Sequence, residues 1–126
     1  MAVTTTADPS VLDQIRRALS NRDLQLLAPI LADDVTWGDV ADPRGCRDRT
    51  DVLDTFSQLM ELGVEGDVAE LAQGDLGILC ELSVRWPVGM AGPSSVWQVY
   101  LLRDDKVAEI RGCEDRQSAR RAAGLS

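Results

Sequence analysis

The chain has 126 residues, 44% of them hydrophobic and 27% charged, a composition typical of a single globular domain. The net charge of −8, from 21 acidic and 13 basic residues, argues against nucleic acid and acidic membrane surfaces as partners, because binding to phosphates depends on a basic face. No apolar run approaches the ~20 residues that cross a bilayer. We therefore expect a cytoplasmic protein whose partner is neutral, apolar or weakly cationic.

The chain contains no histidine and three widely separated cysteines: Cys46, Cys80 and Cys113. A zinc site would need an unusual set of acids and thiols, so no metal or other cofactor is expected, and the cysteines are interpreted as reduced and buried. The missing histidine also removes the usual base of serine and cysteine nucleophiles. Any catalysis would have to use carboxylates, tyrosine, cysteine, lysine or arginine.

The first half of the chain is predicted to be mainly helical. Residues 1–8 are interpreted as a disordered leader, and residues 9–126 as one domain. Ser10 starts a first helix whose apolar stripe is Val11, Leu12, Ile15, Ala18 and Leu19. Asp23 caps a second helix, which Pro29 should make short or bent, and which we expect to end at Asp33 and Asp34.

A short strand is predicted next, from Val35 to Val40, followed by the loop "ADPRGCRDR", in which Asp42 and Pro43 are typical turn formers. A third helix is predicted from about Thr50 to Leu62, with an inward face of Val52, Leu53, Phe56, Leu59 and Met60. Gly63 is well placed to end it in the left-handed conformation.

The second half changes to strand periodicity. "VEGDVAELAQ" and "ILCELSVRWPV" are predicted strands around the turn "GDLG", and "SVWQVYLLR" and "KVAEIRGCE" a hairpin around "DD". In the second strand one face carries Ile78, Cys80, Leu82, Val84 and Trp86. A last short helix would begin after Asp115 and stop at Gly124. The layout is an α+β domain, with three helices packed on one face of a four-stranded meander.

Three stretches in this order resemble the nuclear transport factor 2-like superfamily, in particular its SnoaL-like and ketosteroid-isomerase-like branch. They are "NRDLQLLAPILADDVTWGD", the helix before Gly63, and "YLLRDDKVAEIRGCED". The resemblance covers about Val11 to Asp115. It implies a curved, mainly antiparallel sheet of four to six strands wrapped around a long helix, a cone-shaped cystatin-like or SnoaL-like fold with an apolar pocket. Many members are dimers, so the resemblance also implies a homodimer.

Within this resemblance, "ADDVTWGD" is similar to the isomerase stretch whose final aspartate is the proton-shuttling base, which implies that role for Asp39. The isomerase also uses a first-helix tyrosine and a protonated aspartate on a late strand as oxyanion donors. The matching positions here are about Ile15 and near Trp97 or Gln98. Neither is the family residue, so steroid isomerisation itself is not expected, although Gln98 could donate one hydrogen bond.

A second carboxylate could share the pocket with Asp39, since paired acids suit acid/base chemistry. Glu65 falls close to the second carboxylate of the epoxide-opening polyether cyclases of this fold, and Asp67 is an equally good match. Asp115 lies near the aspartate of the family's closing motif. The alternatives are that Glu65 and Asp67 are solvent-facing acids, that Asp115 is a helix cap, and that Asp39 is a turn former.

The aromatic residues divide between pocket and core. Some of the strand aromatics should line the pocket, where they would favour a flat, apolar ligand, although plain core packing is the alternative for each. Trp97 and Gln98 point to opposite faces of one strand, and alternation groups Gln98 with Tyr100. The predicted substrate-binding residues are Trp37, Trp86, Gln98 and Tyr100.

Two functions are compatible with these patterns. The first is a cofactor-free isomerase or cyclase acting on a small apolar molecule, with Asp39 as general base, Glu65 or Asp115 as acid, and Gln98 or Tyr100 as orienting donors. The second is a non-catalytic small-molecule-binding or dimerisation module of the same fold. The substrate itself is not determined by these patterns.

Overall fold

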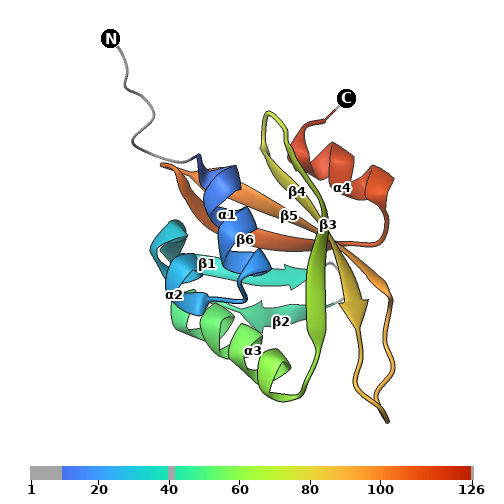
Figure 1. Cartoon of the computed structure of the whole chain (residues 1–126). Coiled ribbons are helices and arrows are strands. Elements are labelled where there is room, and N and C mark those ends of the chain that lie inside the picture. Colours follow the sequence, from blue (N-terminus) through green and yellow to red (C-terminus); the bar gives the residue numbers. More distant parts are fainter. Residues whose placement is uncertain (1–9, 40–41, 126) are drawn as a thin grey trace.

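A computed structural model describes residues 10–39 and 42–125, with the side chains of residue 39 and of residues 42–46 outside the described part. The helices and strands along the chain are shown in Figure 1. They are α1 (Val11–Ser20), α2 (Leu24–Leu27), a 3₁₀ turn (Ala28–Ile30), β1 (Leu31–Asp39), β2 (Asp42–Cys46), α3 (Arg49–Glu61), β3 (Glu65–Gln73), β4 (Gly77–Arg85), β5 (Ser95–Arg103), β6 (Lys106–Cys113) and α4 (Arg116–Ala123).

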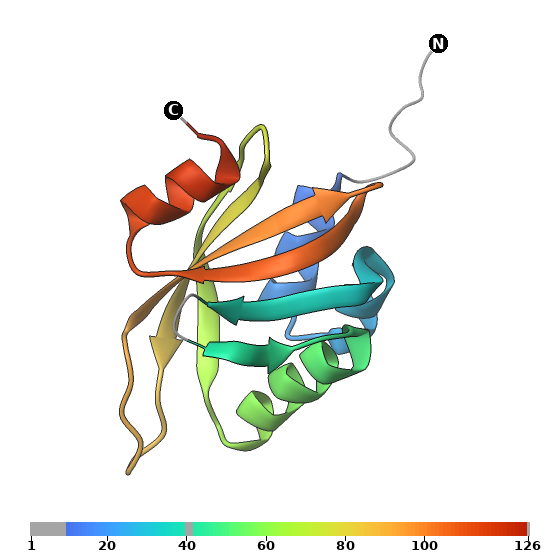
Figure 2. The ribbon, with the colours of Figure 1, turned by 180° about the vertical axis from the view of Figure 1, so that it is seen from behind.

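The strands form one six-stranded sheet in the order β2-β1-β6-β5-β4-β3. Only the pairing of β1 with β6 is parallel; the other neighbours are antiparallel. Helices α1, α2 and α3 lie on one side of the sheet, and α4 lies on the other, as the two opposite views show (Figures 1 and 2). The predicted α+β fold, with its β3–β6 meander, is confirmed.

Strand β1 begins at Leu31, earlier than the predicted Val35, so Asp33 and Asp34 lie on a strand and not at the end of a helix. The helix ends sooner because Pro29 lies in a 3₁₀ turn, where it removes a backbone donor. The register of β1 against β6 shifts between Leu31 and Thr36. A bulge of this kind lets two consecutive acids both face solvent, where they pair with arginines.

The predicted loop after β1 contains strand β2, which pairs with β1 through Trp37 with Cys46 and Asp39 with Asp42. The turn predicted at Asp42 and Pro43 is therefore wrong for the backbone. Proline is tolerated in β2 because that strand is at the edge of the sheet, where one side needs no hydrogen bonds. Val40 and Ala41 lie outside the described residues.

Most of the remaining boundaries agree with the sequence patterns, although β4 ends at Arg85, short of the predicted Val88. Helix α3 is followed by Gly63 at φ 88°, and α4 is followed by Gly124 at φ 79°, the left-handed values that favour glycine. The β5–β6 hairpin turns through Asp104 and Asp105, at φ 54° and 62°. Two consecutive positive values are those of a tight two-residue hairpin turn.

Two apolar clusters hold the sheet. The larger lies between the sheet and α1–α3 and includes the fully buried Ile15 and Ile78. The smaller lies under α4, where Leu79 and Val99 pack with Ala119 and Ala123. The central parts of β4 and β5 are thus buried on both faces. They form a rigid surface on the side that α1–α3 cover.

Among residues 10–39 and 42–125, no helix combines the length and the apolar character needed to cross a membrane.

Candidate ligand-binding site

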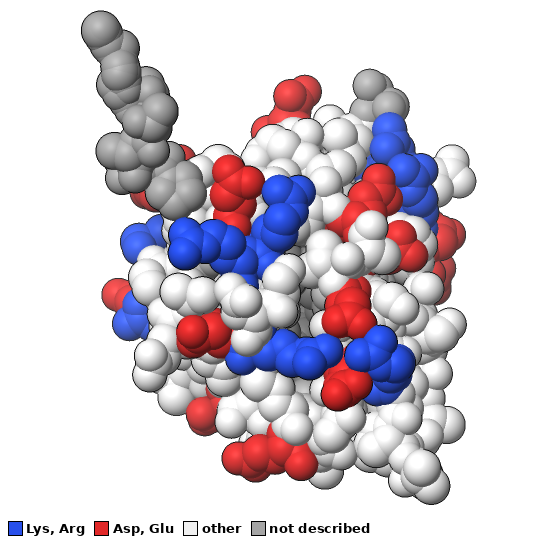
Figure 3. Space-filling model, in the orientation of Figure 1, with Lys and Arg blue, Asp and Glu red and all other residues white. Residues whose placement is uncertain are grey.

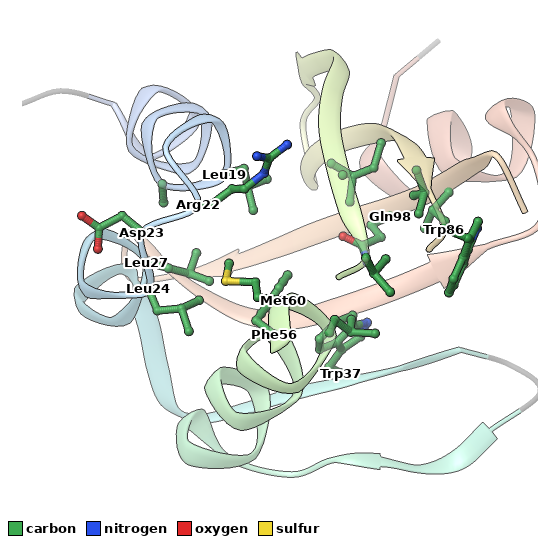
Figure 4. A pocket seen from close by; sticks show the side chains of 17 residues that line it. Leu19, Arg22, Asp23, Leu24, Leu27, Trp37, Phe56, Met60, Trp86 and Gln98 are labelled. Carbon is green, nitrogen blue, oxygen red and sulfur yellow. The ribbon is translucent and has the colours of Figure 1, made fainter. Parts of the chain in front are cut away.

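A cavity of about 190 Å³ lies between the helices and the sheet. It is many times larger than the ~10–15 Å³ that holds one water molecule. Its lining residues come mainly from α1, α2, α3 and the strands β1, β3, β4 and β5, and Figure 4 shows their side chains around it. Three of its lining residues are polar, Arg22, Asp23 and Gln98, and the rest are apolar or glycine.

Aromatic side chains form two parts of the wall. Trp37 of β1 stacks on Phe56 of α3, with ring centroids 4.7 Å apart and planes inclined by 25°. Trp86 follows β4 and lies on the other side of Gln98 from the helices (Figure 4). Its indole Nε1 donates a 2.9 Å hydrogen bond to the carbonyl of Pro93, which anchors the ring to the β4–β5 loop.

The predicted pair Gln98 and Tyr100 lies on the face of β5 that α1–α3 cover. Trp97 lies on the opposite face and packs in the cluster under α4. Gln98 lines the cavity, whereas Tyr100 lies deeper in the core and does not line it. Both are buried, at 4% and 3% exposure. The Tyr100 hydroxyl donates to Gln98 Oε1 over 2.9 Å. Among the described residues, Gln98 Nε2 has no acceptor, so this amide group is available to the cavity.

The neighbours of this amide stay neutral. Burial raises the pKa of Tyr100 well above its usual range, and contact with Cys80 adds to the effect. Burial likewise raises the pKa of the Cys80 thiol to about 12. Both groups therefore keep their protons at neutral pH, and the Tyr100 hydroxyl remains a donor. The cluster Cys80–Gln98–Tyr100 is polar but uncharged.

The rim of the cavity carries ion pairs. Arg22, in the turn between α1 and α2, pairs with Asp67 of β3 at 3.2 Å. Asp67 also pairs with Arg85 of β4 at 2.7 Å, and Arg85 with Glu65 at 2.9 Å. All four side chains are roughly half exposed, so each pair contributes little to stability. Their position joins the α1–α2 turn to the edge of the sheet. Figure 3 shows both signs of charge interspersed on this face.

Asp23 caps α2, where its carboxylate accepts from the backbone of Gln25 at 2.9 Å. In Figure 4 the carboxylate points away from the cavity. Arg22 is held in its ion pair and Asp23 in the cap of α2. Neither residue therefore places a free charged group inside the cavity.

The structure does not bring the predicted second acids to the cavity. Glu65 and Asp67 are exposed and paired with arginine, because β-strand alternation turns them to the same outward face as Arg85. Asp115 caps α4 by accepting from the backbone N–H of Ser118 at 2.8 Å, which lowers its pKa. It lies at the start of the helix that covers the opposite face of the sheet.

Asp39 ends β1, and its side chain lies outside the described part of the structure. Its backbone register is described: Asp39 pairs with Gly112 of β6, and Gly112 pairs with Gln98 of β5. Neighbouring strands are ~4.8 Å apart, so positions 39 and 98 are about 10 Å apart in one row of the sheet. The residue between them is a glycine and contributes no side chain.

Sequence reasoning found Trp37, Trp86 and Gln98 but missed the share of the wall that the helices supply. Phe56 and Met60 were predicted to face inward, and they do, yet the pattern cannot distinguish packing from lining a cavity. Gly66 had no signal at all, although it lines the cavity and a Cβ there would meet nothing within 4 Å. No group of three or more potential metal ligands occurs among the residues described.

No protein-family model and no curated protein matches the sequence. Solved structures do match. A proposed polyketide cyclase from Sinorhizobium meliloti is similar with a TM-score of 0.64 and 15% identity over 88% of this chain and 100% of that one. A nuclear transport factor 2-like protein from Cytophaga hutchinsonii gives 0.65 and 9%, over 90% and 96%.

A third structure, of a protein with a ketosteroid isomerase-like fold from Catenulispora acidiphila in complex with trimethylamine, gives a TM-score of 0.62 and 14% identity over 95% of this chain and 96% of that one. The chain has the nuclear transport factor 2-like fold. At these identities the similarity establishes the fold alone, and the chemistry of this member of the fold has to be argued from its own cavity.

We predict that Gly92→Ala disturbs the cavity wall. A Cβ at this position would lie 2.3 Å from the Trp86 ring, which Pro93 holds in place, so the ring must move. We expect overpacking to cost about 1–3 kcal/mol of unfolding free energy and to alter tryptophan fluorescence. Gly66→Ala, which adds the same methyl group to open space at the same cavity, is the control and should be tolerated. Equal stabilities of the two variants would contradict this packing.

We also predict that stability falls at alkaline pH. An unfolded cysteine loses its proton near pH ~8.5, whereas folded Cys80 holds its proton up to about 12. The folded state therefore binds more protons between these values, and the stabilisation present below pH ~8.5 is lost as pH rises toward 12. Between pH 7 and 10.5, the free energy of unfolding measured with denaturant should fall less steeply with pH in Cys80→Ala than in the wild type. Cys113→Ala, at a half-buried thiol, should change the slope less.

Proposed function

We propose that this protein binds a small, neutral, mainly apolar molecule in the cavity, with Gln98 as its polar anchor. The observation that carries the proposal is the Gln98 amide, whose amino group has no acceptor among the described residues and faces a mainly apolar cavity. Buried polar groups in folded proteins are almost always hydrogen-bonded, so this one is suited to a ligand. Apolar walls with a few placed polar groups are the usual form of a small-molecule site.

The wall favours a flat and uncharged ligand. The stacked pair Trp37 and Phe56 presents aromatic surface, which prefers offset stacking against another ring. Burying an unpaired charge in such surroundings costs far more than burying a neutral group. The rim arginine and aspartate do not remove this cost, because Arg22 is paired with Asp67 and Asp23 is occupied as a helix cap. The affinity would come mainly from apolar surface at ~25 cal/mol per Å².

Cofactor-free isomerase or cyclase chemistry is the second candidate, with Asp39 as the general base. Its support is the sheet register, in which Asp39 and Gln98 occupy one row with a glycine between them. A ligand anchored at Gln98 through a carbonyl oxygen would then extend toward position 39, and a base there could take a proton from the carbon beside the carbonyl. The similarity to a proposed polyketide cyclase is compatible with this chemistry.

Non-catalytic binding is favoured over this candidate by a different observation. Among the described lining residues the only carboxylate is that of Asp23, which is committed to the α2 cap. Glu65 and Asp115 are engaged elsewhere, so the acid partner expected for Asp39 is missing from the described wall. Binding without conversion is therefore our first proposal.

We predict that Gly66→Leu weakens binding in the cavity. Position 66 lines the cavity and has no atom within 4 Å of an added Cβ, so a leucine can extend into the space a ligand would occupy. We expect tetralin, a flat hydrocarbon, to raise the melting temperature of the wild type and to bind Gly66→Leu at least about tenfold more weakly, a loss of ~1.4 kcal/mol.

Ala69→Leu is the matched control, because it adds apolar volume to the same strand at an exposed position. It should leave tetralin binding unchanged. If tetralin and related flat hydrocarbons do not bind the wild type, or bind Gly66→Leu and Ala69→Leu equally well, the cavity is not the binding site.

We predict that Asp39→Asn separates the two candidates. If Asp39 is a base, wild-type protein in D₂O should accelerate deuterium exchange at the carbon beside the carbonyl of 2-tetralone, and Asp39→Asn should lose roughly 10²–10⁴-fold of this acceleration. Nuclear magnetic resonance follows the exchange directly. If wild type and variant both exchange the ketone at the buffer rate while binding it equally, the isomerase candidate fails and the binding proposal stands.

A further inference from the structure

Three polar side chains lie on the helix-facing side of β4 and β5: Cys80, Gln98 and Tyr100. Only Gln98 lines the cavity. Tyr100 is 3% exposed and lies behind it, in the core with Ile15, Ile78 and Ile110. A hydroxyl at this depth contributes nothing to apolar packing. Its strong hydrogen-bond acceptor in the described structure is the Gln98 side chain, and its other polar neighbour is the weakly accepting Cys80 thiol. This points to a role exerted through Gln98.

A glutamine amide has an accepting end and a donating end, and its partners decide which end faces a cavity. Here the Tyr100 hydroxyl donates to Oε1 over 2.9 Å. Turning the amide over would bring the Nε2 hydrogens against the hydroxyl. The hydroxyl could then keep a hydrogen bond only by accepting, which would leave its own proton to the weak acceptor Cys80. Only the orientation that leaves Nε2 free pairs the strong donor, the Tyr100 hydroxyl, with a strong acceptor, Gln98 Oε1.

We propose that Tyr100 is a positioning residue, which fixes the Gln98 amide so that the cavity selects neutral hydrogen-bond acceptors over donors and cations. This inference rests on the proposed binding function. It identifies the ligand class as flat molecules with a carbonyl or ether oxygen.

The expected selectivity follows from the cost of unmade hydrogen bonds. A ligand acceptor satisfies Nε2 in a dry site, an apolar isostere leaves it unpaired, and an ammonium group meets it as a second donor. Sites built to hydrogen-bond one group reject analogues lacking it by large factors. We expect at least a tenfold preference, ~1.4 kcal/mol, for the acceptor over its apolar isostere, and weaker binding still for the ammonium.

Three probes of one shape test this selectivity. They are 2-tetralone, which presents an acceptor; 2-methylenetetralin, which presents no hydrogen-bonding group; and 2-aminotetralin in its ammonium form, which presents only donors. Binding to the 126-residue chain can be followed through the fluorescence of Trp37 and Trp86, which line the cavity. We expect the order ketone, hydrocarbon, ammonium. On ketone binding, the Gln98 side-chain amide protons should also shift downfield in the magnetic resonance spectrum.

Tyr100→Phe tests the positioning role. The ring is retained, so the core stays filled, but the amide loses the partner that fixes it. We expect the ketone-to-ammonium ratio to fall about tenfold or more while the affinity of 2-methylenetetralin stays unchanged. A purely structural role would weaken all three probes alike. Gln98→Leu should remove the preference for the ketone and retain binding of the hydrocarbon.

The outcomes separate this inference from the function on which it rests. If the wild type binds the ammonium or the hydrocarbon at least as well as the ketone, the assigned amide orientation is wrong, and the cavity remains a binding site. If Tyr100→Phe lowers all three affinities equally, Tyr100 is only structural. If no probe binds the wild type, both the inference and the proposed function fail.

Discussion

Two-sided burial of β4 and β5 is the constraint on which the rest of the molecule depends. On one face Leu79 and Val99 are covered by α4, and on the other Ile78 and Tyr100 are covered by α1–α3. A strand held on both sides cannot slide, since a shift of one residue would exchange its two faces. The position of Gln98 is thereby fixed, because it lies between Val99 and Trp97 on a strand that cannot change register. The orientation of its amide is a second, separate matter, and a single hydroxyl behind it controls that.

The cavity lies where α1, α2 and α3 leave part of the sheet face unfilled. Along β4 the same face passes from the filled core at Ile78 and Cys80 to the cavity at Leu82 and Val84. Beyond the strand, Trp86 closes this end, held by its bond to Pro93 and by Gly92 against its ring. Glycine at positions 66 and 92 has opposite roles here. At 66 a missing side chain leaves space for a ligand, and at 92 it leaves space for the indole.

The sequence predicted the elements whose apolar residues repeat regularly and failed where the repeat is broken. Helix α3 and the β3–β6 meander keep clear helix and strand periods despite register shifts at Val68/Glu70 and Leu101/Leu102, and most of their boundaries were predicted closely. Between Leu31 and Cys46 a bulge puts two acids side by side on a strand, and an edge strand carries a proline. In the sequence, the paired acids resemble a helix end and the proline resembles a turn. Alternation also predicted that Gln98 and Trp97 face opposite ways, but it cannot tell whether the space in front of a residue is filled. That depends on packing among α1, α2 and α3.

Among the described residues that line the cavity the only acid is Asp23, which caps α2, and this bears on the class of ligand. Glu65 and Asp67 neutralise Arg85, and Asp115 is held by the backbone of α4. Acids that could have formed a catalytic pair are thus used to join surface elements, where ion pairs contribute little but cost little. Gln98 at the cavity wall and Cys80 and Tyr100 in the core behind it carry no charge at neutral pH, because burial raises the pKa of both titratable members. Under the proposed function, selection between ligands would depend on desolvation and on one hydrogen bond more than on the net charge of −8.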